Sequence, residues 1–281
     1  MTAAMLRLAG PSGPDRPSLT PSAASKAGLD DRLEVFVSPR SYGASQYHAL
    51  RHLIEEGHSH GGVSILAVTS PEIGDGKTTT AINLAGALAQ TPGARVLLVD
   101  GDLRRPSIAR RLGLEHDDAG LVEAILDRGL SLAAVARPYA GSGLAVVRAG
   151  RLAESAYEVL HSPRLGDLLQ EARGHYDYVV VDTAPLLPIP DARIIGKWVD
   201  GFLVVVYADR TPRKTVEESL NLMVPDKVVG LVFNGDQHTA ARRDYQAYAA
   251  GPVADTAGSR WPSRLAASLR RGLSGGATPW R

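Results

Sequence analysis

The sequence has no cysteine and no long apolar run. The absence of cysteine among its 281 residues excludes disulfides, cysteine-ligated zinc sites and thiol-based catalysis. No stretch approaches the roughly 20 apolar residues that a membrane-spanning helix needs. The first ten residues also have too short an apolar run for a secretory signal. The 31 basic and 30 acidic residues nearly cancel, so no overall charge excess attracts a polyanion such as nucleic acid. We therefore expect a soluble, cytoplasmic protein that does not bind nucleic acid.

Composition divides the chain into three segments. Residues 1–35 are rich in proline, serine, alanine and glycine, which predicts a disordered N-terminal arm because such a segment cannot bury enough apolar surface to fold alone. Residues 36–250 contain the apolar runs and are expected to form one folded domain. Residues 251–281 have five arginines and one acidic residue, which predicts a basic, flexible C-terminal tail. A membrane-surface or partner-binding helix is the alternative for this tail, because four apolar residues repeat at every fourth position: Trp261, Leu265, Leu269 and Leu273.

Apolar strands alternate with helical segments through the predicted domain. The spacing of apolar residues predicts helices over residues 41–56, 78–90, 121–126, 157–172 and 216–223. Nearly continuous apolar runs predict strands that are buried on both faces of a sheet, at residues 63–68, 96–99, 144–147, 178–181, 202–206 and 228–233. This alternation predicts an α/β fold with a doubly wound, mainly parallel sheet.

A glycine-containing segment at residues 70–80, here called the phosphate loop, follows the first predicted strand and opens the next helix. Glycines in such a loop allow tight turns in which backbone N–H groups approach phosphate oxygens, and the helix N-terminus adds partial positive charge. Lys77 can reach the β- and γ-phosphates of ATP, and the Thr78 hydroxyl can bind Mg²⁺. The strict P-loop motif has glycine where this chain has Pro71, so a chance Gly-Lys-Thr surface turn is the alternative. The predicted nucleotide-binding residues of the loop are Gly74, Asp75, Gly76, Lys77, Thr78 and Thr79.

Carboxylates follow two further predicted strands. Asp100 and Asp102 come directly after residues 96–99, and residues two apart in an extended segment share a face. Asp182 ends the apolar run at residues 178–181, an arrangement that suits a ligand of hydrated magnesium. A solvated aspartate after a strand is common, so each motif alone is weak. Together with the phosphate loop, they predict a site for Mg-ATP at the carboxyl edge of the sheet.

Three segments, residues 70–85, 96–113 and 176–211, resemble the bacterial tyrosine kinases of the capsular and exopolysaccharide chain-length group. These kinases are relatives of the MinD/ParA-type ATPases, and the resemblance runs from about residue 38 to residue 248. The family has an additional aspartate-rich motif after its second strand, which Asp100-Gly101-Asp102-Leu103-Arg104 matches. The MinD/ParA-type ATPases have a signature lysine early in the phosphate loop, and residues 71–75 contain no lysine. This difference favours the kinase branch.

The resemblance implies an ATP-dependent protein-tyrosine autokinase that regulates polysaccharide polymerisation or export. It implies that Lys77 and Thr78 hold phosphate and magnesium, and that Asp182 holds magnesium through water. Asp100 and Asp102 would support the metal and accept the proton of an attacking tyrosine, so the implied catalytic residues are Asp100, Asp102 and Lys77. The implied metal-site residues are Thr78, Asp100 and Asp182. Asn234 lies where the wider family contacts adenine.

Two features differ from the family pattern. The family usually ends in a dense cluster of acceptor tyrosines, whereas the matching region has only Tyr245 and Tyr248, which are the implied phospho-acceptors. The Glu-x-x-Arg pair that supports oligomers is replaced by Ser45 and His48, although the following Arg51 is present. The resemblance implies a homo-oligomer, but the residues of the pair that would support it are replaced in this chain. The resemblance also implies a membrane-bound polysaccharide co-polymerase that recruits the kinase to the inner face of the membrane and activates it.

Two other functions stay open at this point. One is a MinD/ParA-like ATPase switch with little or no tyrosine kinase activity, which the short tyrosine region and the altered first helix favour. The other is a nucleotide-binding scaffold that has lost catalysis. The presence of Lys77, Thr78 and the three aspartates argues against the scaffold.

Overall fold

The strands form one seven-stranded sheet in the order β3-β4-β2-β5-β1-β6-β7. The computed structural model describes residues 28–59, 63–114, 119–139, 143–151 and 155–236. All neighbouring strands pair in parallel except the β3–β4 pair, which is antiparallel. The predicted α/β fold with a mainly parallel sheet is therefore confirmed. The strands are β1 (Ile65–Thr69), β2 (Val96–Asp100), β3 (Arg137–Tyr139), β4 (Leu144–Val147), β5 (Tyr178–Asp182), β6 (Gly201–Tyr207) and β7 (Val228–Asn234).

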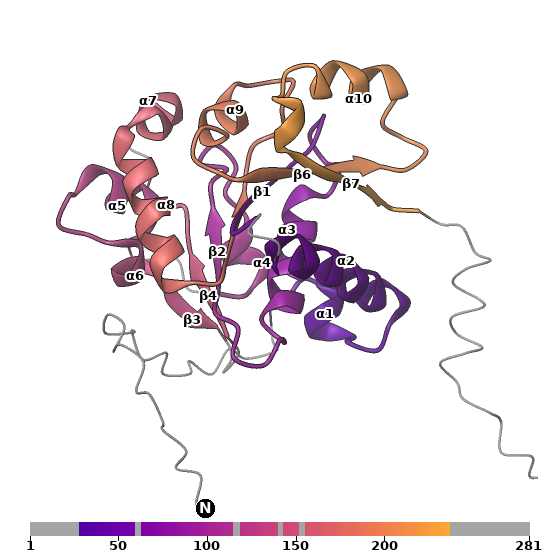
Figure 1. The fold of residues 1–281 in the computed structure, drawn as a ribbon, viewed down its shortest axis with the longest axis horizontal. Coiled ribbons are helices and arrows are strands. Elements are labelled where there is room, and N and C mark those ends of the chain that lie inside the picture. Colours follow the sequence, from indigo (N-terminus) through magenta and orange to yellow (C-terminus); the bar gives the residue numbers. More distant parts are fainter. Residues whose placement is uncertain (1–27, 60–62, 115–118, 140–142, 152–154, 237–281) are drawn as a thin grey trace, which may run out of the picture. The chain divides into compact units, whose positions relative to one another are not determined.

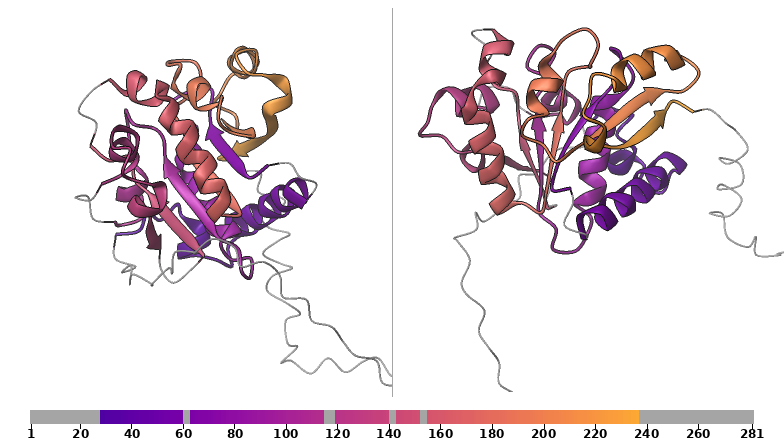
Figure 2. Two further views of the ribbon diagram at one scale, coloured as in Figure 1. Left: turned by 60° about the vertical axis from the view of Figure 1, so that its left-hand side comes forward. Right: turned by 45° about the horizontal axis from the view of Figure 1, so that its top comes forward.

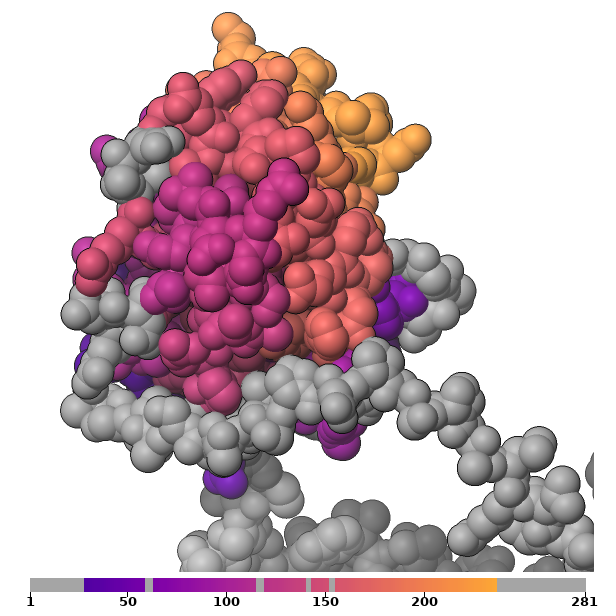
Figure 3. Space-filling view, turned by 90° about the vertical axis from the view of Figure 1, so that its left-hand side faces the viewer, coloured from indigo at the N-terminus to yellow at the C-terminus, as the bar shows by residue number. Residues whose placement is uncertain are grey.

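Helices cover both faces of the sheet (Figure 1, Figure 2). One face packs against α1 (Glu34–Val37), α2 (Tyr42–Ser59), α3 (Lys77–Leu88) and α4 (Ile108–Arg111). The other packs against α5 (Leu121–Leu126), α6 (Leu132–Val135), α7 (Ala156–His161), α8 (Pro163–His175), α9 (Asp191–Ile195) and α10 (Arg213–Leu220). A short 3₁₀ helix, η1 (Pro225–Lys227), precedes β7. Figure 3 views the second face, where residues of α5 to α8 form most of the visible surface.

The alternation of side chains along the strands builds the two hydrophobic cores. In β1, Ile65 and Ala67 join the core under α5 and α8, while Leu66 and Val68 join the core under α2 and α3. Because both faces of the strand are buried, every residue of β1 is apolar except the last, as the sequence pattern predicts. Each large aliphatic side chain buried in this way stabilises the fold by about 1.5–3 kcal/mol relative to exposure.

The helix predicted over residues 157–172 is instead two helices, α7 and α8. The break falls between His161 and Pro163, where proline has no backbone N–H to continue the preceding helix. The Ser162 hydroxyl accepts a hydrogen bond from the Arg164 amide and so caps the new helix. The pattern of apolar residues alone did not reveal this start signal.

The N-terminal arm predicted over residues 1–35 overlaps a packed segment. Leu33 is fully buried and Val35 is 3% exposed, and α1 begins at Glu34. The Asn83 side chain of α3 accepts from the Val35 amide at 3.0 Å and donates to the Arg32 carbonyl at 3.1 Å. Residues 28–35 therefore belong to the folded domain, because two apolar anchors and a buried amide hold them in place.

No helix in the described ranges is both long enough and apolar enough to cross a lipid bilayer. The expected basic tail at residues 251–281 lies outside the described residues.

Candidate nucleotide site

The ends of three adjacent strands bring the predicted motifs together. β5 lies between β2 and β1 in the sheet, and Asp100 pairs directly with Asp182 in the β2–β5 register. The phosphate loop follows β1 and leads into α3, whose first residue is Lys77. Because the carboxyl ends of parallel strands meet at one edge, motifs that are far apart in sequence share a single site.

Two glycines give the phosphate loop its shape. Gly74 and Gly76 have φ values of 91° and 99°, a left-handed conformation that other residues rarely adopt. A Cβ atom on Gly76 would also collide with the amide nitrogen of Asn234. The loop accommodates Pro71 because the Ser70 and Pro71 carbonyls accept hydrogen bonds from the Leu186 and Leu187 amides. The proline therefore replaces the expected glycine without disturbing the turn at the glycines.

Asp75 bonds to the segment after β6 and is not among the residues that line the cavity. Its buried carboxylate accepts from the Glu72 amide at 3.0 Å, the Thr211 hydroxyl at 2.9 Å and the Arg210 guanidinium at 3.2 Å. Arg210 also donates to the Gly74 carbonyl at 2.6 Å and stacks over the ring of Tyr207. These contacts, here called the loop latch, hold the phosphate loop against the end of β6. The sequence predicts Asp75 as a nucleotide-binding residue. Its side chain is occupied by the loop latch, so only its backbone amide is available to bind a nucleotide.

Asn234 lies beside the phosphate loop. Its side-chain amide donates to the Asp75 carbonyl at 2.9 Å. Asn234 is the last residue of β7, which pairs with β6 next to β1. The residue therefore reaches the loop from the opposite side of the site from Asp100 and Asp182.

Lys77 stands between the carboxylates. Its ammonium lies 2.7 Å from Asp102 and 3.7 Å from Asp182, and 3.4 Å from the Thr78 hydroxyl. Burial alone would lower the pKa of Lys77, but the charges of Asp182 and Asp102 outweigh burial and raise it. The lysine is therefore held as a cation at the centre of the site.

Asp100 and Asp182 lie beneath the cavity, and each has one carboxylate oxygen without a hydrogen bond. One oxygen of Asp100 accepts from the Ser107 and Ile108 amides, each at 3.0 Å, and the other is buried without a hydrogen-bond partner. One oxygen of Asp182 accepts from the Thr78 hydroxyl at 2.6 Å, and the other is buried without a hydrogen-bond partner. Burial and the neighbouring Asp182 raise the pKa of Asp100 to about 7, and burial raises the pKa of Asp182.

These oxygens provide a test of whether a magnesium ion fits. Mg²⁺ prefers carboxylate and hydroxyl oxygen together with water and phosphate oxygen. Two orphaned carboxylate oxygens next to the Thr78 hydroxyl supply that chemistry, and a divalent cation would relieve the repulsion between Asp100 and Asp182. The residues present therefore fit the ion.

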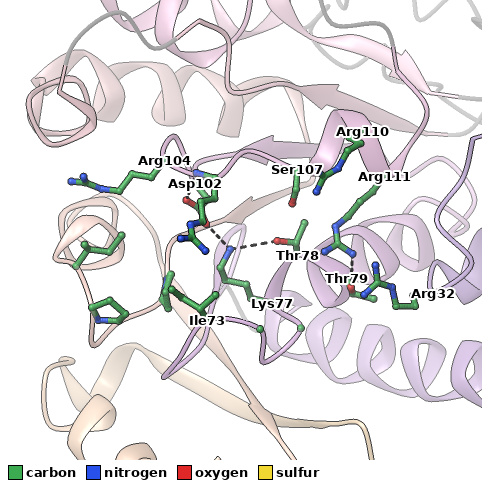
Figure 4. Close-up of a pocket in the computed structure, with 16 residues that line it drawn as sticks. Arg32, Ile73, Lys77, Thr78, Thr79, Asp102, Arg104, Ser107, Arg110 and Arg111 are labelled. Carbon is green, nitrogen blue, oxygen red and sulfur yellow. Dashed lines mark hydrogen bonds and ion pairs between the residues drawn. The ribbon is translucent and has the colours of Figure 1, made fainter.

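A cavity of about 470 Å³ opens above these groups (Figure 4). Gly74, Gly76, Lys77, Thr78, Thr79 and Asp102 line it, so most of the predicted nucleotide-binding residues are brought to one place. Five arginines also line the cavity, of which Arg104 ends the aspartate-rich motif, and Arg105 directly follows it. The others are Arg32, Arg110 and Arg111.

The arginines that the sequence did not reveal depend on tertiary contacts. Asp30 accepts from Arg32 at 2.7 Å and from Arg111 at 3.0 Å, and Arg111 also donates to the Thr79 hydroxyl at 3.1 Å. Arg104 makes a two-pronged ion pair with buried Asp191 at the start of α9, at 2.6 and 3.2 Å. The contacts of Asp30 with Arg111 and of Asp191 with Arg104 join residues more than 80 positions apart, so no local motif marks them.

Some predicted residues lie away from this site. Tyr245 and Tyr248 fall outside the described residues. Ser45, His48 and Arg51 lie on α2, where the Arg51 guanidinium donates to the Ala87 carbonyl at 3.3 Å and lies 3.7 Å from Glu55. Arg51 thus joins α2 to α3 within the domain.

Comparisons with known proteins agree with this geometry. Residues 63–206 match the family described as AAA domain, which is about half of the chain and includes the phosphate loop and all three aspartates. Over 199 residues the chain is 32% identical to the tyrosine-protein kinase YwqD of Bacillus subtilis (strain 168), a match that covers 70% of this chain and 83% of YwqD.

Two further relatives extend the comparison. The chain is 34% identical over 175 residues to the succinoglycan biosynthesis transport protein ExoP of Rhizobium meliloti (strain 1021), covering 60% of this chain but only 22% of ExoP. The solved kinase domain of Escherichia coli tyrosine kinase ETK has a TM-score of 0.67 and 28% identity, covering 75% of this chain and 82% of that chain. Given the shared fold, the assembled site and these matches, the chain belongs to the bacterial tyrosine kinases, a family of P-loop ATPases.

Proposed function

We propose that this tyrosine kinase transfers the γ-phosphate of Mg-ATP to tyrosines on copies of its own chain. Through this autophosphorylation it regulates capsular or exopolysaccharide polymerisation or export. The observation that carries the proposal is the arrangement around Lys77: a lysine ammonium 2.7 Å from Asp102, in an open cavity above two carboxylates with orphaned oxygens. The succinoglycan function named for ExoP supports the polysaccharide part of the proposal.

In this proposal the phosphate loop binds the triphosphate through its backbone amides, including that of Asp75, and through Lys77. Thr78, Asp100 and Asp182 hold Mg²⁺, which neutralises phosphate charge when it is bound. Thr79, at the start of α3, lines the cavity and would contact a phosphate of the bound nucleotide. Asn234, at the end of β7, would contact the base of the bound nucleotide.

The transfer step requires a base, because a tyrosine hydroxyl has a pKa near 10 and is a poor nucleophile at neutral pH. Asp102 accepts the phenol proton while the phenol oxygen forms a bond to the γ-phosphorus. The bond from that phosphorus to the bridging oxygen of ADP breaks, so ADP leaves with the electron pair. Lys77 steadies the charge that develops on the phosphates. Asp100 lies below the cavity, and we assign it to supporting the metal and Asp102 rather than to direct proton transfer.

The acceptors we propose are Tyr245 and Tyr248, reached in trans from a neighbouring copy. About ten flexible residues have a root-mean-square span of roughly 5–6 Å × √n, close to 20 Å, which is enough to reach an adjacent copy. We further propose that a membrane-bound polysaccharide co-polymerase activates the kinase and recruits it to the inner face of the membrane. A MinD/ParA-like switch that transfers no phosphate to protein is the alternative. The kinase names of the relatives and the absence of lysine at residues 71–75 favour the kinase.

The test is phosphotyrosine formation by the purified chain with Mg-ATP, mapped by mass spectrometry. The variant Lys77→Met should abolish phosphotyrosine and weaken ATP binding in a calorimetric titration, because Lys77 is the central cation of the cavity. Lys197→Met is the matched control, since Lys197 is exposed and does not line the cavity. Wild-type protein that hydrolyses ATP without gaining phosphotyrosine would favour the switch. Tyr245→Phe/Tyr248→Phe protein with undiminished phosphotyrosine would show that the acceptors lie elsewhere.

A further inference from the structure

The residues that line the cavity include more basic than acidic side chains. Among its lining residues only Asp102 is acidic, and it contacts Lys77. Behind the lining, Asp30 pairs with Arg32 and Arg111, and Asp191 pairs with Arg104. Six cationic side chains therefore face the same space: Arg32, Lys77, Arg104, Arg105, Arg110 and Arg111.

Arg105 and Arg110 are the cations without an acidic partner. Both are exposed, and neither side chain forms an ion pair or hydrogen bond within the described ranges. They stand on either side of Ser107, in the segment that joins β2 to α4 and in α4 itself. In Figure 4, Arg104 lies on one side of Asp102, whereas Arg110 and Arg111 lie on the other.

The position of Arg105 relates it to the acceptor more than to the nucleotide, and Arg110, the second of these exposed cations, lies at the rim of the same cavity. The Arg105 backbone amide donates to Asp102 at 3.1 Å, so this arginine adjoins the proposed base. A tyrosine that delivers its hydroxyl to Asp102 must carry its neighbouring residues across the surface next to Asp102. Lys77 and the phosphate loop, by contrast, already supply the cation and the amides that a Mg-bound triphosphate needs.

We propose that Arg105 and Arg110 recognise the acceptor and select tyrosines that lie in acidic peptide segments. This inference rests on the proposed kinase function and adds a substrate class to it. The chain's own acceptor region works against this preference, because Tyr245 follows Arg242, Arg243 and Asp244 and thus has a net positive flank. An acidic segment of a partner protein is then a faster acceptor than the chain's own tail.

The experiment compares three synthetic peptides of equal length, each with one tyrosine, whose flanks are acidic, uncharged or basic. With saturating Mg-ATP, we expect kcat/KM to be about tenfold higher for the acidic than for the uncharged peptide, the size expected of two exposed ion pairs. The basic peptide should be the slowest. The preference should fall as salt rises, because exposed charges are screened within about 10 Å at 0.1 M ionic strength.

Variants link the preference to the two arginines. Arg105→Gln/Arg110→Gln should remove most of the preference by raising KM for the acidic peptide. Arg105→Lys/Arg110→Lys should retain it, which separates charge from a folding defect. Arg128→Gln is the matched control, since Arg128 is exposed and does not line the cavity.

The possible outcomes distinguish this inference from the proposed function. Equal rates for the three peptides, or a neutralised variant that raises KM for ATP instead of KM for the peptide, would overturn the acceptor role and leave the kinase intact. Phosphotyrosine on the chain but on none of the peptides would also overturn it. A chain that gains no phosphotyrosine and modifies no peptide would instead refute the kinase proposal.

Discussion

Asp102 is held in place by two different donors, and this determines how its substitution should behave. Its carboxylate accepts from the Lys77 ammonium at 2.7 Å and from the Arg105 amide at 3.1 Å. An asparagine has nearly the same shape and can keep the bond to the amide, but it cannot take a proton from a phenol. Substitution therefore tests the chemistry more than the architecture.

We expect Asp102→Asn to lower the rate of phosphoryl transfer by about 10²–10⁴-fold, the range typical of general acid–base catalysis. Its dissociation constant for Mg-ATP should change far less, because the phosphate loop stays intact. Single-turnover kinetics and calorimetry measure the two effects separately. Asp226→Asn is a suitable control, as Asp226 is an exposed residue of η1 remote from the strand ends that form the site. Wild-type turnover by Asp102→Asn would mean that another group accepts the proton.

Among the connecting elements, the loop latch joins the phosphate loop to the segment after β6. The Thr211 hydroxyl both donates to Asp75 at 2.9 Å and accepts from the Tyr207 amide at 3.2 Å. Asp209, within the same segment, has a φ of 59°, so this turn has a fixed left-handed residue. The latch is thus a rigid turn that supports a loop built on two glycines.

Because of the loop latch, we expect Thr211→Val both to destabilise the protein and to weaken nucleotide binding. Valine has nearly the volume of threonine but offers no hydroxyl, which leaves Asp75 and the Tyr207 amide each short of one partner, at a cost of about 1–3 kcal/mol. Urea denaturation and ATP titration would measure the two effects. Thr215→Val on α10 serves as the control, because no hydrogen bond of the Thr215 side chain is found in the described ranges. A destabilised variant with unchanged ATP affinity would show that the latch supports the fold but not the site.

At the scale of the whole domain, Asp200 joins three parts of the chain. It accepts from the Ser64 and Ile65 amides at the start of β1, each at 2.8 Å, and from Arg173 of α8 at 2.6 Å. Burial alone would raise the pKa of Asp200, but the bonds from Arg173 and the two amides outweigh burial and lower it. A carboxyl with a lowered folded pKa stabilises the fold above its unfolded value, near 3.9, and loses this effect as pH falls through the folded value.

Asp200→Ala should therefore lower the free energy of unfolding by about 2–3 kcal/mol at pH 7, since it leaves two amides and a guanidinium without their acceptor. The deficit relative to wild type should shrink as the pH falls below about 4. Denaturant titrations at pH 7 and at acid pH measure both effects. Asp226→Ala, at an exposed position, should show no such pH dependence in its difference from wild type. A deficit that stays constant down to acid pH would mean that the carboxylate charge is not the stabilising feature.

The sequence predicted the parts of the site that short motifs encode. The phosphate loop and the three aspartates follow from strand, turn and helix patterns, and the parallel sheet then brings them to one edge. It did not predict that Asp75 turns towards Thr211, because that contact joins the phosphate loop after β1 to the segment after β6. Arg111 was missed for the same reason, since Asp30 contacts it across 81 positions of the sequence. Arg32 was missed because it lies with Asp30 in a segment whose composition resembles a disordered arm. Strand β3 was missed because it has only three residues, one of them Pro138.

The insertion of β5 between β1 and β2 also has a consequence during synthesis. β1 and β2 both leave the ribosome before β5, yet they meet in the sheet only through it. Translation proceeds at about 5–20 residues per second. Until Tyr178–Asp182 emerges, the nascent chain has a phosphate loop but lacks Asp182, and β1 has neither of its sheet neighbours, β5 and β6. A ribosome-bound intermediate therefore cannot assemble the nucleotide site until β5 has been synthesised.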